Sequence, residues 1–261
     1  MILIRLKKKE KEFFLNADQI VSLTQRGKQE IQSWDYMRGI TDNITVIPCC
    51  ADMDLFGFNK LDEQKLGEWK NKLHISDTDF IVSYLGSIGT WYMLEEMLDF
   101  FKVVKSKWTN AKFLFITHDE HERIKSEAEK RGLQNDVIIQ AGQRNEVPSL
   151  LSLSNLALFF IRPTYSKLAS SPTKQAEIMA MGIPLVCNAG VGDTDTIVEK
   201  YQAGYVLKNL NNEEYQNLVG TINLSEYNKQ KLRDAASDYA SLDEGLKRYG
   251  LVYKKCIENE N

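Results

Sequence analysis

The residues best suited to bind an anion lie between positions 170 and 192, in the sequence SSPTKQAEIMAMGIPLVCNAGVG. Ser170 or Ser171 is a typical N-cap, and Pro172 suits the first position of a helix. The first N–H groups of a helix have no partner within it, and the helix dipole favours negative charge at that end. The segment therefore predicts a phosphate site at the start of this helix.

Glu177 follows Thr173 and Lys174 by one helical turn, on the same flank of the predicted helix. A carboxylate accepts two hydrogen bonds from a vicinal diol, so Glu177 could hold a ribose beside the phosphate. These residues favour a nucleoside diphosphate as the ligand. The alternatives are a capped helix start that binds nothing and a Glu177 side chain that simply faces solvent.

A glycine loop is predicted beside the same helix start. The apolar run 183–187 follows Gly182 and indicates a buried parallel strand. Gly190 and Gly192 come at its carboxyl end. We therefore expect the helix start and this loop to face one crevice.

The elements that position these residues are predicted from the alternation of short apolar runs with helical patterns, which is typical of βαβ units. We expect an α/β fold with a doubly wound, Rossmann-like parallel sheet. The clearest helix covers 91–108, where apolar residues recur every three or four positions. Further helices are expected over 120–131 and 147–153. The predicted strands cover 19–23, 45–48, 80–85, 112–116, 137–140, 156–161, 183–187 and 205–207.

Composition excludes several classes of protein. The 261 residues are 43% hydrophobic and 26% charged, which is enough for a full core. The formal charge of −3 provides no general attraction to nucleic acid, so we expect none as a partner. The four cysteines have no C-x-x-C spacing, which argues against structural zinc and suits a reducing cytosol. No apolar run approaches the roughly 20 residues that span a bilayer, although peripheral membrane contact stays open.

The chain divides at residues 49–62, where turn and acidic residues interrupt the periodic pattern. We expect this segment to be a hinge between two α/β units. Residues 1–48 offer too few strands for an independent sheet and are interpreted as the remnant of an N-terminal domain. Residues 63–261 are expected to form the complete ligand-binding domain with C-terminal helices.

A family resemblance covers residues 17–207. Five segments carry it in order: TVIPCCADMDLF, YLGSIG, LFIT, VIIQAGQRNEVPSLLSLSNLALFFIRP and SPTKQAEIMAMGIPLVCNAGVGD. The chain resembles the C-terminal, donor-binding half of group 1 retaining glycosyltransferases, which have two Rossmann-like domains in the GT-B arrangement. The resemblance implies that ADQIVSLT closes the acceptor domain and that VIPCCADMDLF is the hinge.

The resemblance implies roles for individual residues in the donor site. Glu177 takes the place of the second carboxylate of the E-x7-E motif and would hold both ribose hydroxyls. The first carboxylate falls on Ala169, which cannot make its contact to the sugar. The family's Arg and Lys after the first strand would fall within SIGTWYM, which has neither. Backbone and hydroxyl groups of that segment are the expected substitutes, with Lys174 as the replacement cation and Arg162 or Lys167 as second choices.

The implied site therefore comprises four groups of residues. The diphosphate is expected at Gly86, Ser87, Gly89, Ser170, Ser171, Thr173 and Lys174, with Thr90 as an additional hydroxyl; the ribose at Glu177; the base at Gln143, Arg144, Asn145 and Val147; and the sugar side at Arg162, Gly190, Gly192, Asp193 and Thr194.

The activity implied is transfer of a hexose from a UDP- or GDP-sugar to a glycan or lipid-linked acceptor, with retention, without a metal or other cofactor, in polysaccharide or glycan synthesis. Such an enzyme would be cytoplasmic or at the inner face of a membrane. We expect this chain alone to transfer little sugar, because the acceptor domain is missing. The alternatives are a catalytically inactive nucleotide-sugar-binding module and a nucleotide-sugar epimerase, since epimerases share this architecture.

Overall fold

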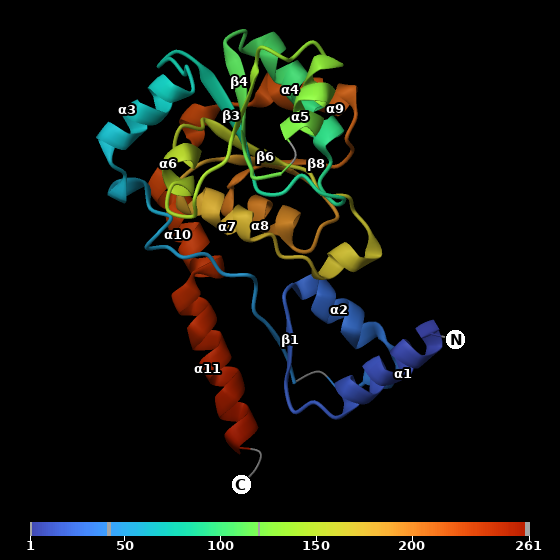
Figure 1. Ribbon diagram of the computed structural model, residues 1–261. Helices are drawn as coiled ribbons and strands as arrows, with labels where there is room; N and C mark the ends of the chain where they lie inside the picture. The colour runs from blue at the N-terminus through green and yellow to red at the C-terminus, as the bar shows by residue number, and fades with distance from the viewer. Residues whose placement is uncertain (1, 41–42, 120, 259–261) are drawn as a thin grey trace.

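The computed structural model describes residues 2–40, 43–119 and 121–258, and its main body is a parallel sheet between two layers of helices (Figure 1). The strand order is β5-β4-β3-β6-β7-β8, and every neighbouring pair is parallel. This confirms the predicted doubly wound α/β fold. The strands are β3 (Phe80–Leu85), β4 (Ala111–Ile116), β5 (Val137–Gln140), β6 (Leu156–Phe159), β7 (Leu185–Asn188) and β8 (Gly204–Leu207).

The helix that follows β3 buries its apolar residues in the core. In α4 (Leu94–Lys107), the residues Leu94, Met97, Leu98, Phe101 and Val104 are almost fully buried, as their spacing predicts. Trp108 ends this helix. The other helices are α3 (Glu63–Lys72), α5 (His121–Glu129), α6 (Val147–Leu151), α7 (Thr173–Ala180), α8 (Thr194–Tyr201), α9 (Asn212–Thr221), α10 (Lys229–Ala240) and α11 (Leu242–Glu258), with short 3₁₀ turns η2 (Phe58–Lys60), η3 (Tyr165–Ala169) and η4 (Leu224–Glu226).

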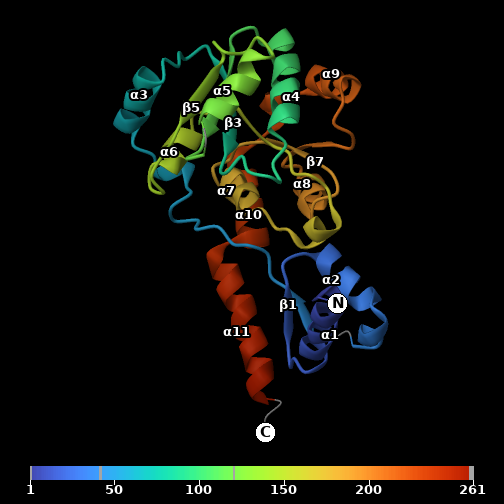
Figure 2. The same cartoon turned by 45° about the vertical axis from the view of Figure 1, so that its right-hand side comes forward.

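The N-terminal part is a smaller unit below the sheet (Figure 2). It contains α1 (Ile2–Leu15), β1 (Ile20–Ser22), α2 (Gln25–Ser33), the 3₁₀ turn η1 (Asp35–Met37) and β2 (Ile44–Val46). Strands β1 and β2 pair in parallel as a two-stranded sheet. Most predicted boundaries lie within one to three residues of the observed ones.

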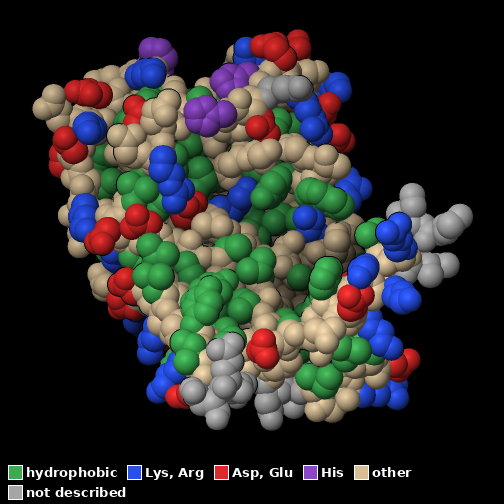
Figure 3. Space-filling view, turned by 60° about the horizontal axis from the view of Figure 1, so that its bottom comes forward, with side chains coloured by type: hydrophobic (Ala, Val, Ile, Leu, Met, Phe, Trp, Pro, Cys, Tyr) green, Lys and Arg blue, Asp and Glu red, His purple; other side chains and the backbone are tan. Residues whose placement is uncertain are grey.

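The connecting segment after β2 runs beside the C-terminal helices. Ala51 bridges to Ser241, and its N–H donates to the carbonyl of Ala240 at 2.9 Å. Helix α11 then extends away from the sheet toward the N-terminal part (Figure 1). Figure 3 brings this end forward and shows hydrophobic side chains gathered on it. The exposed hydrophobic residues of α11 include Leu246 and Tyr253. Among the helices of the described residues, none combines the length and apolar character needed to traverse a bilayer.

Candidate functional site

The loop after β3 and the start of α7 meet at the carboxyl end of the sheet. Gly86 has a φ of +108°, which favours glycine. A Cβ placed there would lie 3.0 Å from the Nζ atom of Lys174. The structure thus brings together the glycine loop and the cation that were both expected at the diphosphate.

Lys174 is buried, and its ammonium group lies among aromatic rings. Nζ lies 3.1 Å from the hydroxyl of Tyr84 and 3.8 Å from the ring centre of Tyr92. Burial lowers the pKa of Lys174 to about 7, while the nearby carboxylates of Glu177 and Asp119 act in the opposite direction. Such a group gains a proton readily when an anion approaches.

Helix α7 begins differently from the expectation. Pro172 is the N-cap, and no side chain caps the helix, so the predicted cap by Ser170 or Ser171 is wrong. Ser171 Oγ instead accepts a hydrogen bond from the N–H of Cys49 at 3.1 Å. Within the described chain, the N–H groups of Thr173 and Lys174 therefore have no acceptor. They remain available to an anion.

Glu177 is buried one turn into α7 and is paired with Arg144. The distance between Arg144 Nη1 and Glu177 Oε1 is 2.7 Å, although the Arg144 side chain is 60% exposed. The guanidinium also lies 4.9 Å above the ring of Phe56. Arg144 was expected at the base, and the structure instead places it on the carboxylate expected to bind ribose.

Asp119 is the charged residue of this site that sequence reasoning missed. Its carboxylate accepts hydrogen bonds from Ser87 Oγ at 2.6 Å and from the N–H of Ile88 at 2.7 Å. Gly89 N–H donates to Ser87 Oγ, and Gly86 N–H to the carbonyl of Ile116. Most hydrogen-bond donors of this loop, which we expected to face a diphosphate, are thus already bonded to other groups of the protein. The sequence signal that could have identified Asp119 is its position just after β4, because β4 pairs in parallel with β3.

The loop after β5 lies near this group. Gln143, Arg144 and Asn145 are exposed, as a base-binding edge would require. Val147 does not share that position, because it begins α6 and packs in the hydrophobic core. The ring Nε2 of His118 lies 2.8 Å from the carbonyl of Gly142, which connects this loop to the end of β4.

The glycine loop after β7 is closed against the segment before α7. The N–H of Gly192 donates to the carbonyl of Lys167, and the N–H of Gly190 to the carboxylate of Asp195. A Cβ at Gly192 would lie 1.9 Å from the carbonyl oxygen of Ser170. Neither N–H group is therefore free for the sugar or phosphate that we expected there.

The other residues expected on the sugar side are dispersed. Asp193 accepts hydrogen bonds from the N–H groups of Gln25 and Arg26, so it caps α2 of the N-terminal part. Thr194 is buried at the start of α8. The side chain of Arg162 is exposed and has no partner among the described residues.

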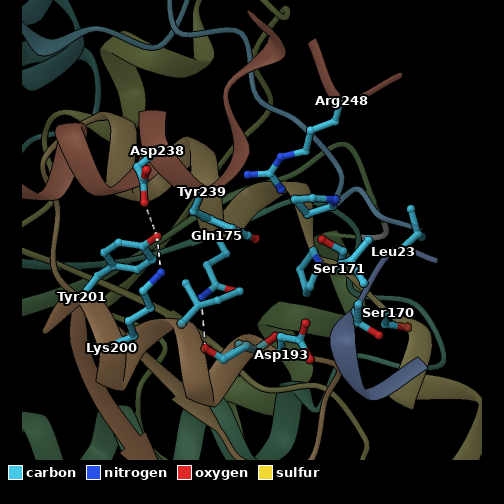
Figure 4. Close-up of a pocket in the computed structure, with 16 residues that line it drawn as sticks. Leu23, Ser170, Ser171, Gln175, Asp193, Lys200, Tyr201, Asp238, Tyr239 and Arg248 are labelled. Atoms are coloured by element: carbon cyan, nitrogen blue, oxygen red, sulfur yellow. Dashed lines mark hydrogen bonds between the residues drawn. The ribbon is translucent and has the colours of Figure 1, made fainter. Parts of the chain in front are cut away.

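Two hollows lie on either side of the segment Ser170–Pro172, which we call the Ser170–Pro172 wall. A cleft of about 290 Å³ lies between Trp91, Tyr92, Lys167 and the wall, and includes Ala169. A cavity of about 370 Å³ lies behind the wall, between α7, α8 and the C-terminal helices (Figure 4). In the described residues, no three His, Cys, Asp or Glu side chains are grouped as a metal site would need.

This chain was compared with protein-family models and with curated protein sequences. The family model for glycosyl transferases group 1 matches residues 67–242. No curated protein sequence matches this chain significantly.

Solved structures share the fold at low sequence identity. The glycosyltransferase from Rickettsia africae ESF-5 has a TM-score of 0.73 at 17% identity, with 95% of this chain and 67% of that chain covered. The sucrose-phosphate synthase from Thermosynechococcus elongatus has a TM-score of 0.71 at 15% identity, with 96% and 61% covered. Anabaena HepE in complex with UDP-glucose has a TM-score of 0.70 at 16% identity, with 93% and 64% covered. The chain thus spans about two thirds or less of each of these proteins.

Proposed function

This chain belongs to the group 1 glycosyltransferase family, and we propose that it binds the nucleoside diphosphate sugar from which a retaining enzyme of that family transfers a hexose. In this proposal, residues 63–261 are the donor-binding domain, 49–62 the hinge, and 1–48 part of the acceptor domain. The acceptor is a glycan or a lipid-linked sugar, and the product is a polysaccharide or another glycan. The complex with UDP-glucose of the similarly folded Anabaena HepE supports a UDP-sugar as the first donor to test.

One observation carries the proposal: a buried cation, a glycine loop and a free helix start converge at one point. Lys174 Nζ lies against Gly86, and the unpaired N–H groups of Thr173 and Lys174 open the same helix. Glu177 follows one turn later and is buried. A diphosphate at Lys174 with its ribose at Glu177 satisfies both groups in a single ligand.

These groups would act on the leaving diphosphate. The bond from the anomeric carbon to the diphosphate oxygen breaks, and that oxygen keeps the electron pair. The acceptor hydroxyl forms the new bond at the same carbon and gives up its proton to the departing diphosphate. Lys174 and the two N–H groups stabilise the negative charge that develops on the leaving oxygen. No metal is included in this proposal, because the ammonium group and the helix start supply the positive charge.

Binding requires two rearrangements in the site. The ribose must replace the Arg144 guanidinium at Glu177, and the diphosphate must compete with the Asp119 carboxylate for Ser87 and Ile88. Both Arg144 and Asp119 lie in loops rather than in strands. We propose that these loops adjust when the nucleotide binds.

A second candidate function is a nucleotide-sugar-binding module without catalysis. The exposed Ala169 supports it, because this residue lines the cleft where the family has a carboxylate for the sugar. Binding alone does not separate the two candidates. An enzyme hydrolyses or transfers the sugar of its donor at a measurable rate, whereas a module only binds it.

Calorimetric titration of the full chain with UDP and with GDP tests the proposal. We expect saturable binding of at least one of them and a matching increase in melting temperature. Slow release of free sugar from the corresponding nucleotide sugar would favour the enzyme over the module. Absence of heat and of any thermal shift at millimolar concentrations of both nucleotides would rule out the proposed site.

A further inference from the structure

The cavity behind the Ser170–Pro172 wall is not part of the nucleotide site described above. Its inner wall is formed by α7 and α8, and its mouth by α10, α11 and the N-terminal part (Figure 4). Its volume of about 370 Å³ is within the usual range for small-molecule sites, roughly 300–1,000 Å³. Nothing in the proposed transfer reaction uses it.

Two buried polar atoms of this cavity have no hydrogen-bond partner among the residues that the structure describes. They are Oε1 of Gln175 and Oγ1 of Thr194. Gln175 is fully buried, and Thr194 is 1% exposed. The amide orientation of Gln175 is set by its Nε2, which donates to the carbonyl of Thr194 at 3.1 Å. A buried polar atom without a partner is costly, so a ligand that hydrogen-bonds to these atoms would be stabilised there.

The rim carries balanced charge and hydroxyl groups. Lys200 donates to the hydroxyl of Tyr201 at 2.9 Å, and that hydroxyl donates to Asp238. Arg248 uses Nε to contact Glu244 at 2.9 Å, and its terminal nitrogens have no partner within the described chain. The lining contains two cations, Lys200 and Arg248, and two carboxylates, Asp193 and Asp238. The formal charge of these four residues is zero. The remaining wall is largely apolar or aromatic, from Leu23, Val46, Pro48, Ile197 and Tyr239.

The unpartnered oxygen of Gln175 decides the chemistry of the occupant, because it can only accept a hydrogen bond. Carboxylates and phosphodiesters are ionised at neutral pH and offer it no donor. A hydroxyl donates to Gln175 and can also accept from Thr194 or Arg248. Tyrosine rings and aliphatic side chains suit the C–H faces of a sugar ring. We propose that this cavity is a saccharide-binding site, separate from the nucleotide site and on the opposite side of the Ser170–Pro172 wall.

The test uses the full chain, with D-glucose, N-acetyl-D-glucosamine and maltose as probes, followed by saturation-transfer NMR and calorimetry. The variant Thr194→Val removes only the unpartnered Oγ1 at nearly constant volume. Gln175→Met removes the unpartnered Oε1 together with the Nε2 group that donates to the Thr194 carbonyl. Ser83→Ala is the matched control, because Ser83 Oγ is also buried and unpartnered but does not line the cavity. Removal of an unpartnered group is not expected to prevent folding, which circular dichroism verifies.

We expect saturable binding of at least one probe, about fivefold or more weaker in each cavity variant, since each loses about one hydrogen bond. Binding should be unchanged in Ser83→Ala and in the presence of saturating UDP. Preference for maltose over glucose would identify a glycan end rather than a free monosaccharide. Failure of all three probes to bind, equal binding in the cavity variants, or displacement by UDP or inorganic phosphate would overturn the proposal. The results with the three sugar probes alone do not depend on whether the chain binds a nucleotide.

Discussion

The guanidinium of Arg144 lies 2.7 Å from the carboxylate of Glu177, so the residue expected to bind ribose is already paired within the protein. The pair places an exposed cation on a buried anion. A ribose that offers two hydroxyl donors can replace one guanidinium donor there. The pair therefore keeps Glu177 hydrogen-bonded until a nucleotide binds.

Replacement of Glu177 by Gln should weaken nucleotide binding through the ribose. We expect the affinity for UDP or GDP to fall about tenfold or more, because hydrogen bonds to a charged acceptor contribute about 1.5–3 kcal/mol. The loss should be much smaller for the 2′-deoxy nucleotide, which lacks one hydroxyl. Calorimetry with both nucleotides measures this difference. Glu213→Gln, at an exposed carboxylate of α9, is the control. Equal losses for the two nucleotides would place the ribose elsewhere.

Lys174 should make nucleotide binding depend on pH. Its pKa is lowered to about 7 by burial, and a bound diphosphate raises it, so binding takes up a proton above that pH. The affinity for UDP or GDP should fall as the pH rises from 7 to 9. Lys174→Met should bind more weakly and lose most of this dependence. A wild-type affinity that is constant over the same range would contradict the proposed contact.

The same lysine predicts how stability changes with pH. The pKa of Lys174 is lower in the folded chain than its ordinary 10.5, so the unfolded chain binds more protons between pH 7 and 10.5. The contribution of Lys174 to the free energy of unfolding should therefore increase with pH across this window. Chemical denaturation at several pH values should show this increase in wild type relative to Lys174→Met. An identical pH dependence of both proteins would refute it.

Asp119 should oppose the diphosphate, because its carboxylate occupies the loop that the phosphates must approach. We expect Asp119→Asn to bind UDP or GDP about fourfold tighter, the effect of one like charge at about 5 Å in water. Asp54→Asn makes the same change in net charge at an exposed pair with Lys60 and should have no effect. If the affinity for the nucleotide increases equally in both variants, only the net charge of the protein affects binding. A weaker affinity in Asp119→Asn would show that this carboxylate is needed to order the loop.

Gly192 should tolerate no side chain. Its φ is +46°, and a Cβ there would lie 1.9 Å from the carbonyl oxygen of Ser170. We expect Gly192→Ala to reduce the free energy of unfolding by about 2 kcal/mol or more, through backbone strain and a direct clash. Gly220 of α9 has open space around it, so Gly220→Ala should stabilise by about 0.5–1 kcal/mol. Denaturant titration of both variants measures the contrast, and a neutral Gly192→Ala would disprove the close approach.

The sheet was predictable because its strands are apolar runs bounded by turn residues. Residues 80–85 and 137–140 were predicted at their observed limits, since a short apolar run between turn residues is a local signal. Strand β7 begins at Leu185, two residues later than expected, because Ile183 and Pro184 complete the turn before it. The position of Lys174 near the glycine loop follows from the order of the strands.

The pairings within the site were not predictable, because they depend on which side chains meet across loops. Arg144 and Glu177 are distant in sequence, and no local pattern indicates that they pair. The same holds for Asp193, which looked like a sugar ligand beside Gly192 but caps α2. The serine cap failed for a different reason: Pro172 itself is the N-cap, and Ser171 bonds to the connecting segment instead.

The N-terminal part contains a sheet of only two strands, which is marginally stable by itself. The first N–H group of its helix α2 donates a hydrogen bond to the carboxylate of Asp193. The adjacent Gly192 packs against the carbonyl of Ser170. A change in the angle between the N-terminal part and the main sheet would therefore displace the Ser170–Pro172 wall. Relative rotation of the two parts would alter the shapes of the hollows on both faces of that wall together.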